Sequence, residues 1–153
     1  MKTLQVGLGE RSYDIRIGRD AMVSGWAGLP PGKRALIVSD SNVDPLYGDR
    51  CQDALVKLGW GVARSVVPAG ESSKSQACLS ELYKQAVSAG LDRSSYIVAL
   101  GGGVVGDLAG FLAASYLRGV HLIQVPTSLL ALVDSSVGGK TGINLAEGKN
   151  LVG

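Results

Sequence analysis

The sequence predicts an α/β fold with a mostly parallel sheet, helices on both faces of that sheet and a β-hairpin at the N-terminus. Short β-rich apolar runs alternate with longer amphipathic runs along the chain. This β-α-β-α-β order is typical of parallel strands joined by right-handed crossovers. The chain has 153 residues, 46% of them hydrophobic and 18% charged, which indicates one globular domain.

The hairpin is predicted by two short runs near the start of the chain. Residues 3–8 and 13–17 alternate in polarity on either side of Gly9 and Glu10, a pattern typical of an antiparallel pair, here expected at a sheet edge. The pattern changes after the stretch 28–32, which is rich in Gly and Pro.

The remaining elements follow from where each run begins and ends. The run at 34–38 is apolar and stops at Ser39, Pro68 closes the run at 62–67, and Gly90 ends a helical pattern that begins near Ser73. The predicted strands are 34–38, 62–67, 95–100 and 121–125, and the predicted helices are 45–58, 73–89 and 104–117.

Composition excludes several classes of function. The net charge is +2 without a basic stripe, so nucleic acid is not an expected partner. No apolar run approaches the roughly 18 residues that cross a bilayer, and the N-terminus does not resemble a signal peptide, so we expect a soluble, cytoplasmic protein without a membrane partner. Cys51 and Cys78 have no metal or disulfide spacing, and His121 is the single histidine, so a zinc site within this chain is not expected.

The glycine-rich segment from Gly101 to Asp107 carries the strongest chemical signal. It follows a predicted strand, opens a predicted helix and matches G-x-G-x-x-G at Gly101, Gly103 and Gly106. Absent side chains let backbone N–H groups approach a diphosphate at a helix N-terminus. A tight structural turn with close packing is the alternative interpretation.

Polar residues follow other predicted strands at the edge where open α/β sheets bind ligands. Asp40 and Asn42 follow the first central strand, and Glu71 and Lys74 follow the second. No acidic residue ends the strand at 121–125, so a ribose contact would have to come from elsewhere, and these positions are available for it. Helix capping and solvated charge are the alternative interpretation for each of them.

Two lysines in adjacent glycine-rich loops, Gly139-Lys140-Thr141 and Gly148-Lys149-Asn150, indicate an anionic ligand. Gly139-Lys140-Thr141 is similar to the end of a P-loop, but that motif requires glycine where Asp134 stands, so a P-loop NTPase is disfavoured. Lys140 and the nearby Lys149 each offer a compact ammonium to an anion. Solvated loop lysines are the alternative.

Taken together and in order, these segments resemble the 3-dehydroquinate synthase family, and the resemblance covers essentially the whole chain. The segments are Arg11-Ser12-Tyr13, Ile17-Gly18, Pro68 with Gly70-Glu71 and Lys74, Gly101 to Asp107 with Gly110-Phe111, Arg118-Gly119, Pro126-Thr127, Asp134 to Thr141, and Gly148-Lys149-Asn150.

The resemblance implies a Rossmann-like domain that binds NAD over residues 1–153. The family converts 3-deoxy-D-arabino-heptulosonate 7-phosphate, a sugar phosphate, to 3-dehydroquinate with phosphate release, in the shikimate pathway of aromatic amino acid biosynthesis. NAD is regenerated in each turnover. A second, helical domain of the family holds a divalent metal, zinc or cobalt, and the full-length enzymes tend to be homodimers.

The resemblance also implies a role for individual residues. It assigns Gly102, Gly103, Val104, Val105, Gly106 and Asp107 to the NAD diphosphate; Asp40, Asn42, Gly70, Glu71 and Lys74 to the adenosine side; Thr127 and Ser128 to the nicotinamide side; and Asp134, Lys140, Lys149 and Asn150 to the substrate, with Lys140 and Lys149 also near NAD. Ser128 replaces a common threonine and keeps a hydroxyl, whereas Ala69 replaces a frequent aspartate.

The family's metal ligands have no counterpart in residues 1–153, so the resemblance implies that the C-terminal helical domain is absent and that this chain alone has no synthase turnover. Two alternatives stay open. The first is a domain of a related metal-dependent polyol or alcohol dehydrogenase. The second is a non-catalytic sensor of a nucleotide or sugar phosphate.

Overall fold

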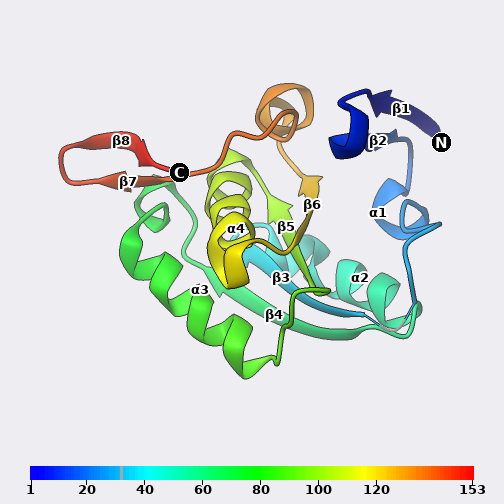
Figure 1. The fold of residues 1–153 in the computed structure, drawn as a ribbon, viewed down its shortest axis with the longest axis horizontal. Coiled ribbons are helices and arrows are strands. Elements are labelled where there is room, and N and C mark those ends of the chain that lie inside the picture. Colours follow the sequence, from blue (N-terminus) through cyan, green and yellow to red (C-terminus); the bar gives the residue numbers. More distant parts are fainter. Residues whose placement is uncertain (32) are drawn as a thin grey trace.

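The structure is a computed structural model that describes residues 1–31 and 33–153, and its centre is a four-stranded parallel sheet (Figure 1). The strands lie in the order β4-β3-β5-β6, and every neighbouring pair is parallel. Their bounds are Arg34–Asp40 for β3, Gly61–Val67 for β4, Tyr96–Gly101 for β5 and His121–Pro126 for β6. The predicted parallel sheet is therefore confirmed, and its strands run one to two residues beyond several of the predicted bounds.

Helices cover both faces of this sheet, as the sequence predicts. Helix α2 (Asp44–Val56) packs on one face, and helices α3 (Gln76–Ser88) and α4 (Gly103–Ser115) pack on the other (Figure 1). Successive strand residues point to opposite faces, so β3 supplies Ala35 and Ile37 to the α2 side and Leu36 and Val38 to the α3–α4 side. These four side chains are at most 1% exposed. Continuous apolar runs are required because both faces are buried.

The helix ends differ from their predicted positions for local reasons. Helix α3 begins three residues later than predicted, because the Ser75 side chain accepts a hydrogen bond from the Cys78 N–H and so caps the first turn. Helix α4 ends at Ser115 because Leu117 and Arg118 adopt left-handed backbone conformations, with φ of 51° and 67°.

The N-terminal hairpin forms, but its predicted place at the edge of the main sheet is wrong. Strands β1 (Lys2–Val6) and β2 (Tyr13–Ile17) pair only with each other, as a separate two-stranded sheet. The guanidinium of Arg16 donates to the carbonyls of Gly25 and Ala27, in the segment that follows the short helix α1 (Ala21–Ser24). This contact ties the hairpin to the α1 region instead of to a strand edge.

The last quarter of the chain holds elements that the sequence pattern does not predict. A π-helical turn spans Ala131–Ser135, and strands β7 (Ile143–Leu145) and β8 (Gly148–Val152) form a second antiparallel hairpin, which projects from the body of the molecule in Figure 1. Gly148, Lys149 and Asn150 are therefore strand residues, so their predicted placement in a loop is wrong. The alternating pattern of a strand is hidden in β8 by Gly148 and by Asn150, whose backbone is left-handed. The pairing of β7 with β8 is also irregular in register.

The two cysteines are free thiols with different surroundings. Cys51 is fully buried under the α2 face of the sheet, and Cys78 is partly buried beside the opposite core. Burial raises the pKa of the Cys51 thiol to about 12, although the nearby Arg64 lowers it. Cys51 is therefore a protonated core side chain at neutral pH.

Over residues 1–31 and 33–153, no helix is both long and apolar enough to span a membrane.

A buried ion pair joins the segment before α3 to the first turns of α4. The Nζ atom of Lys74 lies 2.5 Å from Oδ2 of Asp107, and the two side chains are 5% and 20% exposed. Backbone bonds extend the junction to the last hairpin, since Asn144 donates to the carbonyl of Lys74 and Gly142 donates to that of Asp107. Two helices and β7 are thus fixed at one point near the glycine turn.

We expect that removing either partner of this pair destabilises the protein more than removing both. Lys74→Met or Asp107→Leu leaves an uncompensated charge in a mostly buried position, which costs on the order of 3 kcal/mol of unfolding free energy. The double variant removes both charges and recovers most of that loss. Urea denaturation measures the free energy of unfolding of the wild type and of all three variants.

Lys84→Met is the matched control, because Lys84 pairs with Glu81 at an exposed site where an ion pair contributes little. Single variants no less stable than Lys84→Met would show that the pair does not hold the junction together.

Candidate functional site

The carboxyl ends of the four parallel strands converge at one edge of the sheet. In register, Asp40 at the end of β3 lies beside Val67 of β4, and Gly101 of β5 lies beside Pro126 of β6. The chain proceeds from β3 outward to β4 and from β5 outward to β6, so the strand order reverses between β3 and β5. Open α/β sheets bind ligands outside this reversal point, which makes this edge the candidate site.

The N-terminus of α4 presents unpaired amide groups at this edge. Within the described residues, the N–H groups of Gly103, Val104 and Val105 meet no acceptor, and the first bond of the helix runs from Gly106 N to Gly102 O at 2.9 Å. Gly102, Gly103 and Val104 are partly exposed, whereas Val105 is buried. The free donors of Gly103 and Val104, at the positive end of a 13-residue helix dipole, form a place suited to an anion.

The glycines of this turn serve packing as well as access. A Cβ atom added at Gly101 would lie 2.7 Å from the side chain of Val105, and one added at Gly106 would lie 3.0 Å from Oε1 of Gln124 on β6. These two positions support the structural interpretation of the turn. At Gly103 the nearest atom to such a Cβ is Oγ of Ser135, at 3.2 Å, so a side chain there would crowd the exposed donors.

Asp40 makes local hydrogen bonds, in agreement with the alternative interpretation that it caps a helix. Its Oδ1 atom accepts hydrogen bonds from the N–H groups of Asn42 and Val43, at 2.9 and 3.0 Å, and so closes the turn that leads into α2. The adjacent Ser41 accepts from the N–H of Ala69, which joins the segments after β3 and β4. Asp40 and Asn42 lie at the candidate edge, and a role toward a ligand stays a prediction.

Glu71 is the centre of a polar network that the sequence does not reveal. Its Oε1 atom accepts from Nδ2 of Asn144 at 2.8 Å and lies 4.0 Å from Nζ of Lys149. The side-chain oxygen of Asn144 accepts from the N–H of Asn150, also at 2.8 Å. Asn144 therefore connects the loop after β4, which contains the left-handed Gly70, to the predicted substrate residue Asn150. In the sequence, the one weak indication that Asn144 belongs to the site is its place between two glycine-rich segments.

Thr127 and Ser128 lie directly beside the glycine turn. The N–H of Thr127 donates to the carbonyl of Gly101 at 3.0 Å, which continues the β5–β6 pairing past the last strand residue. The Ser128 hydroxyl caps the next helical segment by accepting from the N–H of Ala131. A Cβ atom added at Gly102 would lie 3.4 Å from that hydroxyl oxygen. The structure thus places both predicted nicotinamide-side residues at the candidate edge.

The two predicted lysines are both exposed, and each lies beside a different carboxylate. Nζ of Lys140 lies 3.0 Å from Oδ1 of Asp134, while Lys149 approaches Glu71. The ammonium of Lys74, by contrast, points into the buried pair with Asp107. The sequence predicts a nucleotide contact for Lys74 and Asp107, whereas the structure directs these two side chains toward each other.

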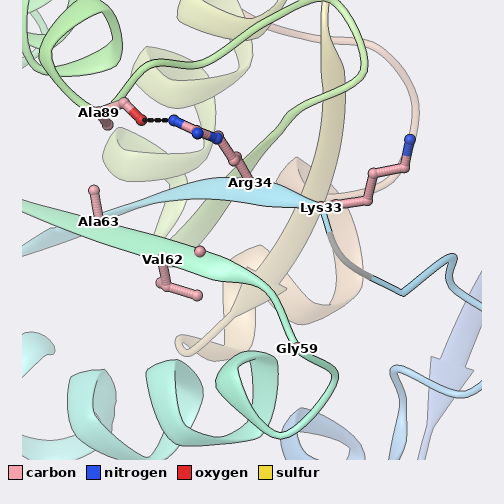
Figure 2. Close-up of a pocket in the computed structure, with 7 residues that line it drawn as sticks. Lys33, Arg34, Gly59, Val62, Ala63 and Ala89 are labelled. Carbon is pink, nitrogen blue, oxygen red and sulfur yellow. Dashed lines mark hydrogen bonds between the residues drawn. The ribbon is translucent and has the colours of Figure 1, made fainter.

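The cavity in Figure 2 lies at the opposite edge of the sheet. It has a volume of about 360 Å³ and is lined at the amino ends of β3 and β4 by Lys33, Arg34, Gly61 and Val62, among others. Figure 2 shows the Arg34 guanidinium directed at the carbonyl of Ala89, which it reaches at 3.3 Å, just past the last turn of α3. Arg34 therefore satisfies the end of a helix, and this cavity is separate from the candidate site.

Metal-binding side chains do not gather in the described part of the chain. Over residues 1–31 and 33–153, no three residues of His, Cys, Asp or Glu lie close enough together to hold a metal ion. The single histidine, His121, stacks on Tyr96 with ring centroids 4.7 Å apart, which is a packing role.

Comparison with known proteins shows which family this chain resembles. A model of the 3-dehydroquinate synthase N-terminal region matches residues 64–153. The 3-dehydroquinate synthase of Symbiobacterium thermophilum is 57% identical over 150 residues, which are 95% of this chain and 42% of that protein. The enzyme of Desulforamulus reducens is 51% identical over all of this chain and 44% of its own length. The chain thus spans less than half the length of these relatives.

Solved structures agree with this relationship. A 2-deoxy-scyllo-inosose synthase complexed with carbaglucose-6-phosphate, NAD⁺ and Co²⁺ has a TM-score of 0.91 at 32% identity, over 99% of this chain and 42% of that one. A 2-epi-5-epi-valiolone synthase from Streptomyces hygroscopicus subsp. jinggangensis, with NAD⁺ and Zn²⁺ bound, has a TM-score of 0.83 at 31% identity, over 97% and 41% of the two chains.

A glycerol dehydrogenase from Schizosaccharomyces pombe shares the fold alone, with a TM-score of 0.56 at 24% identity over 69% of this chain and 25% of that one. The sheet is accordingly Rossmann-like, as the resemblance implies. By the matched family model and by relatives about half identical over its whole length, the chain belongs to the 3-dehydroquinate synthase family.

Proposed function

We propose that this chain is the NAD-binding part of a 3-dehydroquinate synthase, the enzyme that converts 3-deoxy-D-arabino-heptulosonate 7-phosphate to 3-dehydroquinate with release of phosphate. The observation that carries this proposal is the pair of free N–H groups at the partly exposed Gly103 and Val104, placed where the strand order reverses. Membership in the family and the NAD⁺ named for two related structures support it.

The residues at this edge suit the parts of NAD in order along the sheet. The amides of α4 would hold the diphosphate, while Glu71 and Asp40, at the ends of β4 and β3, would face the adenosine ribose. Thr127 and Ser128, at the end of β6, would line the nicotinamide side. When bound, NAD would take a hydride from the substrate and return it later in the same turnover.

The remaining predicted residues would bind the substrate. Lys140 and Lys149 are exposed ammonium groups that would attract the carboxylate and the phosphate of the substrate and would also lie near NAD, since a lysine is a compact charge with three donors. The carboxylates of Asp134 and Glu71 lie beside them and would orient these side chains. Asn150 would donate or accept one further hydrogen bond, from a backbone that Asn144 holds in place.

A divalent metal does not fit the donor set of the described residues, so no step through a metal is assigned to this chain. We propose that the metal ligands belong to a helical domain of the complete enzyme, and that the homodimer is a property of that enzyme. With this division, a ligand at the candidate edge would lie between two domains, a common place for ligand sites.

We expect the purified chain to bind NAD⁺ weakly and to lose that binding when Gly103 is replaced by valine. The added side chain would stand against Ser135 and block the approach to the α4 amides, which should weaken affinity at least about tenfold, or 1.4 kcal/mol. Isothermal titration calorimetry measures the NAD⁺ affinity of the wild-type chain and of Gly103→Val.

Gly7→Ala is the control, because nothing lies within 4 Å of a Cβ atom added at that glycine. Thermal melts should show that both variants remain folded. Absence of heat with wild-type protein at millimolar NAD⁺, or equal affinity for Gly103→Val, would contradict the proposed site.

We also expect no synthase turnover from this chain, with or without added zinc or cobalt. Hydride transfer requires cofactor and substrate to be held in a near-attack geometry, and residues 1–31 and 33–153 contain no ligand group for the metal that would polarise the substrate hydroxyl. A coupled assay for phosphate released from 3-deoxy-D-arabino-heptulosonate 7-phosphate measures this, and release above the rate without protein would refute the expectation.

A further inference from the structure

The N-terminal hairpin reaches the glycine-rich loop at 136–142 through one hydrogen bond. The hydroxyl oxygen of Tyr13, on β2, accepts from the backbone N–H of Gly138 at 3.0 Å, across 125 positions of sequence. Gly138 is exposed, has φ of +98°, and has nothing within 4 Å of a Cβ atom built on it. The contact therefore acts on a loop residue that has few other constraints.

Lys140, one of the predicted substrate residues, lies in this loop, and the π-helical turn just before the loop lies beside the glycine turn. Asp134 and Lys140 flank Gly138 in sequence, and their side chains form an ion pair at 3.0 Å. Between them, Ser135 packs against Gly103 at the start of α4. The loop is thus located between α4 on one side and the hairpin on the other.

We propose that Tyr13 is a positioning residue: its hydroxyl holds the backbone at Gly138, and so sets where the ammonium of Lys140 stands relative to the α4 amides. Tyr13 itself contacts no reacting group in this proposal. The part that concerns Lys140 rests on the proposed function, since it assumes that this ammonium faces the anionic ligand.

Tyr13→Phe tests the proposal by removing one oxygen atom. A single hydrogen bond contributes about 0.5–1.5 kcal/mol, which corresponds to about a two- to tenfold effect. Amide hydrogen exchange, followed by NMR on the ligand-free chain, should accelerate by this factor at Gly138, while the amides of β3 and β5 keep their rates. Unchanged exchange at Gly138 would overturn the proposal whether or not NAD binds.

Tyr83→Phe is the matched control, because the Tyr83 hydroxyl also makes one hydrogen bond, at 2.6 Å to Ser115, between α3 and α4. This variant should leave the exchange at Gly138 and the affinity for NAD⁺ unchanged. Acceleration at Gly138 in both variants would show a general loosening of the fold and would also overturn the positioning role.

A double-mutant cycle separates positioning from mere stabilisation. Tyr13→Phe and Lys140→Met should each weaken NAD⁺ binding, and the double variant should bind no more weakly than Lys140→Met alone, because both act through one ammonium. Additive losses would contradict the proposal. If NAD⁺ does not bind the wild-type chain, the proposed function fails, and the exchange rate of Gly138 still decides the role of Tyr13.

Discussion

The first turn of α4 sets the requirement that the rest of the structure meets. A helix leaves its first amide groups without partners inside the helix, and here those of Gly103 and Val104 open onto the reversal point of a parallel sheet. The turn must be narrow enough to bring these donors to the surface, and it must also pack tightly. Gly101 and Gly106 provide the packing against Val105 and Gln124. One short segment therefore serves both the core and the ligand edge.

Segments far apart in sequence keep this turn and its surroundings in place. The Lys74–Asp107 pair joins α4 to the loop after β4, and Asn144 extends the junction to the last hairpin through Lys74, Glu71 and Asn150. The polar side chains thus depend on backbone positions that neighbouring elements determine. An edge with fixed donors suits the proposed ligand site between two domains, in which a second domain would supply the remaining contacts.

The sequence predicts those features of the fold that nearby residues determine, and it does not predict those that depend on contacts between distant segments. The parallel strands are predicted because runs such as 34–38 are apolar on both faces, and α3 is predicted by its spacing of apolar residues. The place of the first hairpin depends on Arg16 binding carbonyls that no local pattern reveals, and the last hairpin is hidden by Gly148 and the left-handed Asn150. The residues at the edge were predictable from motifs, whereas the contact networks of Asn144 and Tyr13 arise only on folding.

Backbone NMR during titration with NAD⁺ tests the central claim most directly, because it reports on each amide of the glycine turn separately. If the free N–H groups of α4 receive the diphosphate, the amide resonances of Gly103 and Val104 shift most, and the amide resonances at the amino ends of the strands, near Arg34 and Gly61, do not move. Shifts centred elsewhere, with those two resonances unchanged at saturating NAD⁺, would contradict the assignment of this helix terminus as the cofactor site.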